Sequence, residues 1–144
     1  MSTFLAKEEL KTVADINLVN KITALDDTIV EDIILESIET MKGYLSKYYD
    51  IDAIFTATGD TRHKVVVKFL KYITIYEIYE RHTREQNAVA ARRFAEAMDW
   101  LEKLNKGEYF DRTLPIIPKE ITTAPEGSTG DNRYGGNTQY TSNY

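Results

Sequence analysis

The run KVVVKFLKYITIYEIYE, at residues 64–80, constrains the fold more than any other stretch of this chain. Its β-branched residues are common in strands, but its length and the recurrence of apolar residues at i, i+3 and i+4 favour a helix. Val66, Phe69 and Leu70 share one face, and other aliphatic or tyrosine side chains occupy most of the rest. A helix that is apolar on most sides must be covered on most sides. We therefore expect a central helix over about 61–82.

The residues before this run predict three further helices. Two short ones cover about 6–12 and about 15–24, with Asp15 as the N-cap of the second. A longer helix starts at Thr28, because Thr28 and Glu31 have the spacing of a capping box. We interpret Asp26 and Asp27 as capping residues and not as a metal site. Gly43 interrupts good helix formers, and we expect another helix to approach closely there.

The connections and the last helix follow from turn and cap signals. The stretch 48–60 is expected to be a connector that packs down onto the body, with Gly59 and Asp60 marking the turn and the next N-cap. Thr83 and Gln86 have a second capping-box spacing, which predicts a helix that starts near 84. Gly107 is a suitable C-terminal stop for it.

The composition changes after Gly107. All three prolines and five of the seven glycines lie from this residue onward. We expect Leu114–Pro118 to lie extended against a groove, while the rest has no reason to fold alone. The sequence therefore predicts an all-α fold, a small helical bundle of two short N-terminal helices and three longer helices with an extended C-terminal tail. Residues 1–107 would form the helical domain and 108–144 an extended arm.

Several function classes have no support in the residues. The chain has no cysteine, which excludes disulfides, thiol catalysis and cysteine-ligated metals. Its two histidines are not spaced as in a metal motif, and neither a Gly-rich phosphate loop nor a nucleophile elbow is present. We interpret His63, near Asp60, as a helix-start neighbour. We expect that the protein is not an enzyme, with no catalytic residue, metal site or cofactor.

No apolar run approaches the length of a membrane span. The start, MSTFLAKEEL, lacks the basic and apolar regions of a signal peptide. We therefore expect a protein that is made in the cytosol, without a membrane partner.

Charge is divided unevenly along the chain. Residues 1–60 hold five Lys/Arg and twelve Asp/Glu, whereas residues 61–106 hold ten and six. An acidic and a basic half suit head-to-tail contact between identical copies, and the alternative is an ordinary solvated surface. The candidate intersubunit residues are Glu31, Asp32, Glu36, Glu39, Lys64, Lys68 and Lys71.

A second basic group surrounds the turn before the last helix. It consists of Arg81, His82, Arg84, Arg92 and Arg93. Such a patch can neutralise phosphates, which keeps open the alternative of a small helical DNA-binding protein that uses residues 81–93. The other interpretation is a solvated or intersubunit face, and the acidic total charge of the chain argues against a free-standing DNA binder.

The arm carries aromatic residues that nothing local can bury. Tyrosine offers a large contact area with few torsions to fix, so Tyr134, Tyr140 and Tyr144 suit a segment that orders on a partner. The alternative is a solubilising tail.

The stretch ESIETMKGYLSKYYDIDAIF, residues 36–55, is followed by several later blocks of aromatic and basic residues. In their order along the chain, these blocks resemble a family of tailed-phage head–tail connector proteins, the Mu-like type that was formerly a domain of unknown function. In that family a long helix ends in Tyr-Leu followed by Arg/Lys-Tyr, and Tyr44-Leu45 and Lys47-Tyr48 match this pattern. The later blocks that match are Ile75-Tyr76-Glu77-Ile78-Tyr79, Arg93-Phe94 with Ala97 and Trp100-Leu101, Lys106-Gly107, and the tail Arg133-Tyr134-Gly135-Gly136-Asn137 with Asn143-Tyr144. A proline-rich loop of many members is replaced here by Tyr49-Asp50-Ile51-Asp52.

The resemblance implies a virion structural protein, an adaptor of the neck that joins head to tail. Copies would form a closed, dodecameric ring below the portal protein, and genome DNA would pass through its lumen during packaging and ejection. The arm would bind the portal or other neck or tail proteins through Arg133, Tyr134, Asn137, Tyr140 and Tyr144. Candidate lumen-facing or DNA-facing residues are Arg81, Arg84, Arg92 and Arg93.

Overall fold

The computed structural model describes residues 4–81 and 87–118. The elements follow in the order 3-10 helix η1 (Lys7–Thr12), α1 (Ile16–Ile22), α2 (Asp27–Leu45), α3 (Ile51–Phe55), 3-10 helix η2 (Gly59–Thr61), α4 (Lys64–Glu80) and α5 (Ala88–Lys106). In these two ranges β-type pairing is limited to one bridge, between Tyr49 and Ile116. The prediction of an all-α bundle with two short N-terminal helices and three longer ones is confirmed, with the first short helix being of the 3-10 type.

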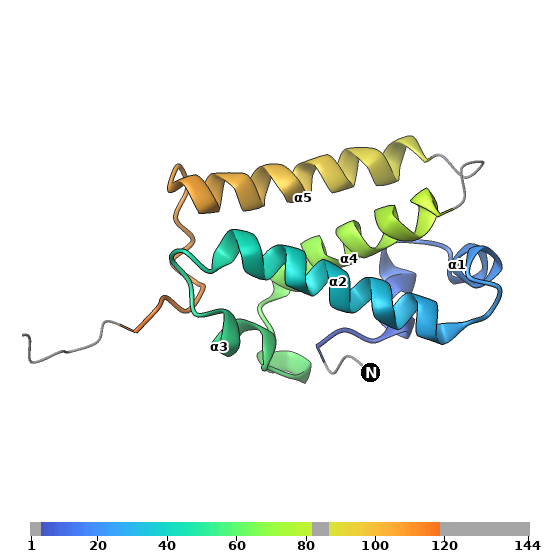
Figure 1. Ribbon diagram of the computed structural model, residues 1–144, viewed down its shortest axis with the longest axis horizontal. Coiled ribbons are helices and arrows are strands. Elements are labelled where there is room, and N and C mark those ends of the chain that lie inside the picture. The colour runs from blue at the N-terminus through green and yellow to red at the C-terminus, as the bar shows by residue number, and fades with distance from the viewer. Residues whose placement is uncertain (1–3, 82–86, 119–144) are drawn as a thin grey trace, which may run out of the picture.

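Helix α4 lies at the centre of the bundle and packs against α5, α2 and α1 (Figure 1). Val66, Leu70 and Ile78 in it are completely buried, as expected of a helix that is apolar on most sides. Burying an aliphatic side chain of this size contributes about 1.5–3 kcal/mol to stability. The prediction of a central helix is confirmed, although the helix spans 64–80 and not 61–82.

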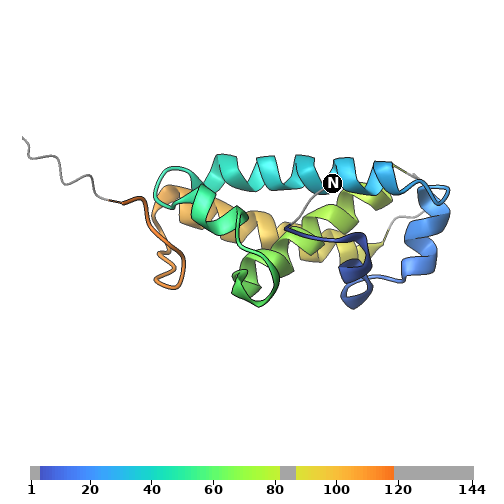
Figure 2. The same ribbon diagram turned by 90° about the horizontal axis from the view of Figure 1, so that it is seen from below.

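The long elements and the short ones lie on different sides of the body. Seen from below, α2 runs along one long side, and η1, η2 and the first turn of α4 lie on the opposite side (Figure 2). Helix α4 extends between these two sides and packs against α2. This arrangement separates the outward face of α2 from the surface formed by η1 and α4.

Two of the predicted helix starts are wrong. Helix α2 does not begin with a Thr28–Glu31 capping box, because the Asp26 carboxylate caps it two residues earlier by accepting from the Thr28 N–H over 3.0 Å. This confirms the interpretation of Asp26 as a cap. Helix α4 is capped by His63 and not by Asp60, since Gly59–Thr61 forms η2 first.

The N-caps of α1 and α5 are an aspartate and an asparagine. Asp15 accepts from the Asn17 N–H over 2.9 Å and caps α1 as predicted. Thr83 and Gln86, the expected capping box of the last helix, lie outside the described residues. Helix α5 begins at Ala88, where the Asn87 side chain accepts from the N–H groups of Val89 and Ala90.

The two glycines at the ends of long helices differ. Gly107 ends α5 with φ 77°, as predicted for a left-handed C-cap. Gly43, in contrast, is exposed, and nothing lies within 4 Å of where its Cβ would be. The expectation that another helix of the same chain approaches Gly43 is therefore wrong.

The connector between α2 and α4 packs down as predicted, because Ile54 and Phe55 of α3 are buried in the core. Residues 108–118 run back along residues 48–50, where this connector begins. The Asp50 N–H donates to the Pro115 carbonyl over 2.9 Å, and the Ile117 N–H donates to the Tyr48 carbonyl over 3.2 Å. Leu114 is 3% exposed and inserts into the core. The stretch Leu114–Pro118 thus lies extended against the body, as expected.

Candidate functional site

The surface of the described body offers three features that suit contact with other molecules: an apolar end, an acidic face and a basic groove. Within residues 4–81 and 87–118, no group of three or more His, Asp or Glu side chains is arranged to hold a metal ion. No helix in the same ranges is long and apolar enough to cross a membrane.

The apolar end lies where α2 and α5 finish (Figure 1, left). Its exposed apolar side chains, hereafter the end cluster, are Tyr48 (36% exposed), Tyr109 (47%), Phe110 (50%), Ile116 (51%) and Ile117 (45%). Exposed apolar side chains that gather at one end of a body suit an interaction site. Of these five residues, only Ile116 and Ile117 belong to the stretch that was predicted to lie extended against a groove, and the cluster itself was not predicted.

A buried tyrosine positions the end cluster. Tyr49 is 1% exposed, and its hydroxyl accepts a 3.0 Å hydrogen bond from the Asp111 N–H. Its ring stacks on Phe110 with 5.5 Å between the ring centroids, and its backbone forms the bridge to Ile116. Burial raises the pKa of the Tyr49 hydroxyl. The aromatic pairs Tyr48-Tyr49 and Tyr109-Phe110, each just after a helix end, were the sequence signal for this cluster.

His63 fastens the segment 108–118 to the start of α4. Its Nδ1 accepts from the Val66 N–H at 3.4 Å, and its Nε2 lies 2.6 Å from the Thr113 hydroxyl. That hydroxyl donates to the Asp111 carboxylate over 2.5 Å, so the His63 Nε2–H is the donor to Thr113. The interpretation of His63 as a helix-start residue is confirmed.

The acidic face is the outward side of α2. Asp32, Glu36 and Glu39 are exposed and Glu31 is partly buried, so this part of the predicted intersubunit set lies on one helix surface. Glu39 pairs with Lys42 at 3.1 Å. The negative charge continues onto the C-terminal part of α4, where burial and then the charges of Glu80 and Glu36 raise the pKa of Glu77.

The basic groove lies on the opposite side, between η1 and α4. It encloses about 450 Å³ and is lined by Glu9, Thr12, Val13, Arg62, Lys64, Val67, Lys68, Lys71 and Tyr72. Lys64, Lys68 and Lys71, the other part of the predicted intersubunit set, therefore share one concave surface.

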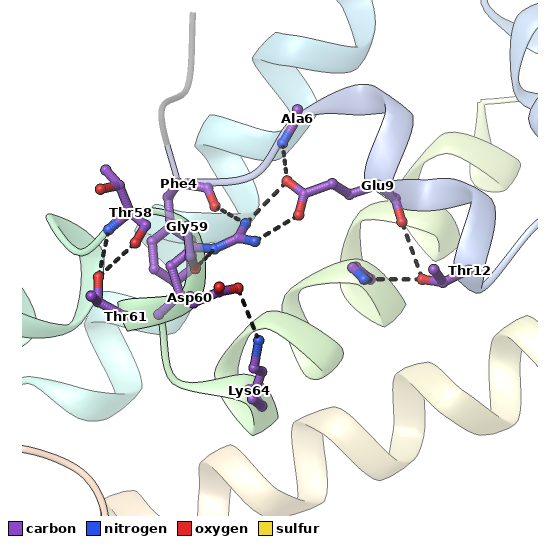
Figure 3. A network of polar contacts seen from close by, with 11 residues as sticks. Phe4, Ala6, Glu9, Thr12, Thr58, Gly59, Asp60, Thr61 and Lys64 are labelled. Atoms are coloured by element: carbon purple, nitrogen blue, oxygen red, sulfur yellow. Dashed lines mark hydrogen bonds and ion pairs between the residues drawn. The ribbon is translucent and has the colours of Figure 1, made fainter.

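Arg62 fixes the wall of this groove, and Figure 3 labels its partners Phe4, Glu9 and Gly59. Its guanidinium donates to both Glu9 carboxylate oxygens over 2.8 and 3.0 Å, and also to the carbonyls of Phe4 (2.7 Å) and Gly59 (2.8 Å). The side-chain hydrogen bonds from Arg62 hold the pKa of Glu9 below its ordinary value. A bidentate pair of this kind is both strong and directional.

The side chains of the three lysines in the groove make fewer polar contacts than Arg62 does. Lys71 donates to the Thr12 hydroxyl over 3.0 Å, and the Lys68 ammonium lies 4.6 Å from the centroid of the Phe69 ring. In the described residues their ion pairs are limited to the exposed 3.8 Å contact of Lys64 with Asp60. These ammonium groups can therefore donate hydrogen bonds to an anion or a carboxylate of another molecule.

Of the basic group at 81–93, the structure describes Arg81, Arg92 and Arg93. Arg81 and Arg92 are exposed. Arg93 donates to the Val13 carbonyl over 3.0 Å and lies 5.3 Å from the Tyr72 ring centroid, so its guanidinium is engaged within the bundle. His82 and Arg84 lie outside the described residues, as do the predicted arm contacts Arg133, Tyr134, Asn137, Tyr140 and Tyr144.

The comparisons with known proteins agree with the resemblance found in the sequence. The model of the family described as "Bacteriophage Mu, Gp36" matches residues 1–128, which include every element from η1 to α5 and the docked segment 108–118. Among curated proteins and among solved structures, no match was found.

Proposed function

Because the chain belongs to the bacteriophage Mu Gp36 family, we propose that it is a structural protein of the virion neck. In this proposal it is a head–tail connector whose copies form a ring below the portal, and its C-terminal arm docks on neighbouring neck proteins. The match shows the phage family, and the connector role is our proposal.

The end cluster is the observation that supports this role best. Five exposed apolar side chains gather at one end of the body, and residues 119–144 continue the chain from that same end, after Pro118. An apolar anchor and a long tyrosine-bearing segment that start at one place can engage one partner together. Linking two contacts in this way raises avidity without a new interface.

Charge separation supports the ring. Helix α2, which carries the acidic face, lies on the side opposite to η1 and the first turn of α4 (Figure 2), and residues of η1 and α4 line the basic groove. Two different complementary faces are what a head-to-tail ring requires. Arg81 and Arg92 remain candidates for facing DNA in the lumen.

The test uses two variants in a phage that lacks the native copy. Deleting residues 127–144 removes the end of the arm that carries Tyr134, Tyr140 and Tyr144. The double change Ile116→Asp and Ile117→Asp places charge in the end cluster. Each variant should keep the helical content of the body, because the helices of the described residues all end by Lys106. Filled heads and finished tails should accumulate without joining.

Val89→Asp is the matched control, because Val89 is 45% exposed but lies at the other end of α5. This variant should join heads to tails normally. Normal yields of joined particles from both test variants would contradict the connector role.

The DNA-binding alternative predicts instead that the purified chain retards duplex DNA in a salt-dependent way that Arg81→Gln with Arg92→Gln abolishes.

A further inference from the structure

A single apolar side chain lies within the acidic face of α2. Asp32, Leu35, Glu36 and Glu39 are spaced at i, i+3, i+4 and i+7, so they form one stripe along the helix. Leu35 is 42% exposed. One turn beyond Glu39, Gly43 leaves the surface open. The stripe therefore presents an apolar residue bordered by carboxylates, with no bulky side chain at position 43.

The basic groove has the inverse pattern. Val13 and Val67 contribute apolar lining, while Lys64, Lys68 and Lys71 border it. Its volume of about 450 Å³ is many times the roughly 30 Å³ that one water molecule occupies. A leucine side chain fits in such a space, and the carboxylates beside it would then meet the three ammonium groups.

The two surfaces cannot meet within one copy. The three lysines, Lys64, Lys68 and Lys71, recur at i, i+4 and i+7 on one face of α4. At roughly 100° per residue, Glu77 and Glu80 lie on nearly the opposite face of this helix. That opposite face is the one near α2, because the charge of Glu36 acts on Glu77. Figure 2 shows the same separation, with α2 along one long side and η1 on the other. A contact between the stripe and the groove therefore joins different copies and leaves a stripe and a groove free at the two ends.

We propose that the α2 stripe of one copy docks in the basic groove of the next, with Leu35 entering between the lysines. This rests on the proposed ring and names the contact that builds it. Such an interface is heterologous, so it propagates until the rotation closes the ring. Complementary charge around the apolar centre also disfavours stripe-to-stripe and groove-to-groove pairing.

Cysteine cross-linking tests the contact directly, because the chain has no cysteine of its own. Full-length protein with both Leu35→Cys and Lys68→Cys is oxidised at a concentration at which the native chain self-associates. We expect a ladder of disulfide-linked oligomers on a non-reducing gel. A mixture of the two single variants should stop at the dimer. The control pair Leu35→Cys with Arg92→Cys should give no ladder, because Arg92 is exposed on α5, outside the groove.

Charge exchange provides the second readout. Glu36→Lys or Lys68→Glu alone should weaken self-association, measured by sedimentation, about tenfold. The two changes in one chain restore an opposite-charge pair at every interface and should recover most of the loss. Both positions are exposed, so thermal unfolding should stay close to that of the native chain.

The outcomes separate this inference from the connector role. A chain that assembles and joins heads to tails, but gives no 35–68 cross-link and no charge rescue, would overturn the docking contact alone. Cross-linking of Leu35→Cys to itself as fast as to Lys68→Cys would also overturn it. Retention of duplex DNA by the native chain, abolished by Lys68→Glu, would assign the groove to phosphate instead.

Discussion

At the scale of single residues, Arg62 connects two regions that are far apart in the sequence, the residues around η1 and the turn before α4. It joins the chain before η1, the Glu9 side chain in η1 and the turn at Gly59 (Figure 3). The sequence analysis singled out neither Arg62 nor Glu9, because their side chains are 53 positions apart and no local pattern links them. A single guanidinium with several oriented donors can fix a surface that short-range rules do not predict.

Replacing Glu9 with Gln should lower the free energy of unfolding by about 1–2 kcal/mol at pH 7, because a charge-assisted bidentate contact becomes a neutral one. Chemical denaturation followed by circular dichroism measures the change. Asp60→Asn is the matched control, because the Asp60–Lys64 pair that it breaks is exposed and 3.8 Å long. That variant should unfold like the native chain, and an equal loss in both variants would contradict the role given to Arg62.

The same contact predicts a pH dependence. The pKa of Glu9 is lower in the folded chain than its ordinary value of about 4.3. The pair therefore stabilises the fold above pH about 4.3, and this contribution is lost as the pH falls through the lowered pKa of the folded state. The difference in stability between the native chain and Glu9→Gln should shrink as the pH falls below about 4.

At the scale of elements, periodicity predicted which segments are helical, but the helix bounds depend on competition between nearby caps. Thr28 has a suitable capping-box spacing, yet Asp26 captures both the N–H and the hydroxyl of Thr28 and starts α2 earlier. A local rule cannot tell which of two adjacent acceptors prevails. The short helix α3 was missed for a similar reason, since five residues give too few turns for a periodic signal.

Two glycine substitutions separate backbone conformation from packing. Gly107→Ala should destabilise the fold by about 1 kcal/mol or more, because φ is 77° and a Cβ would lie 3.3 Å from the Tyr48 hydroxyl.

Gly43→Ala should stabilise the isolated body by roughly 0.5–1 kcal/mol, because the position is inside α2 and nothing lies within 4 Å of the added Cβ. Thermal unfolding of the two variants checks both signs, and a destabilising Gly43→Ala would contradict the open environment described for α2.

At the scale of the whole molecule, the charge asymmetry of the sequence became two surfaces on opposite sides of one body. The predicted acidic residues lie on α2 and the predicted lysines border one groove. Helical spacing was sufficient to group each set. It was not sufficient to reveal the groove, which needs η1 beside α4, or the end cluster, which needs residues 108–118 folded back onto Tyr48 and Tyr49. Both depend on contacts between distant segments.

We propose that copies of this member of the bacteriophage Mu Gp36 family form a ring in the virion neck, and an electron cryo-microscopy reconstruction of the neck would reveal such a ring. We expect a ring of helical bodies below the portal, each with its α2 face against the η1–α4 side of the next copy and its C-terminal arm on a neighbouring protein. A well-resolved neck in which no density fits this body would contradict the claim.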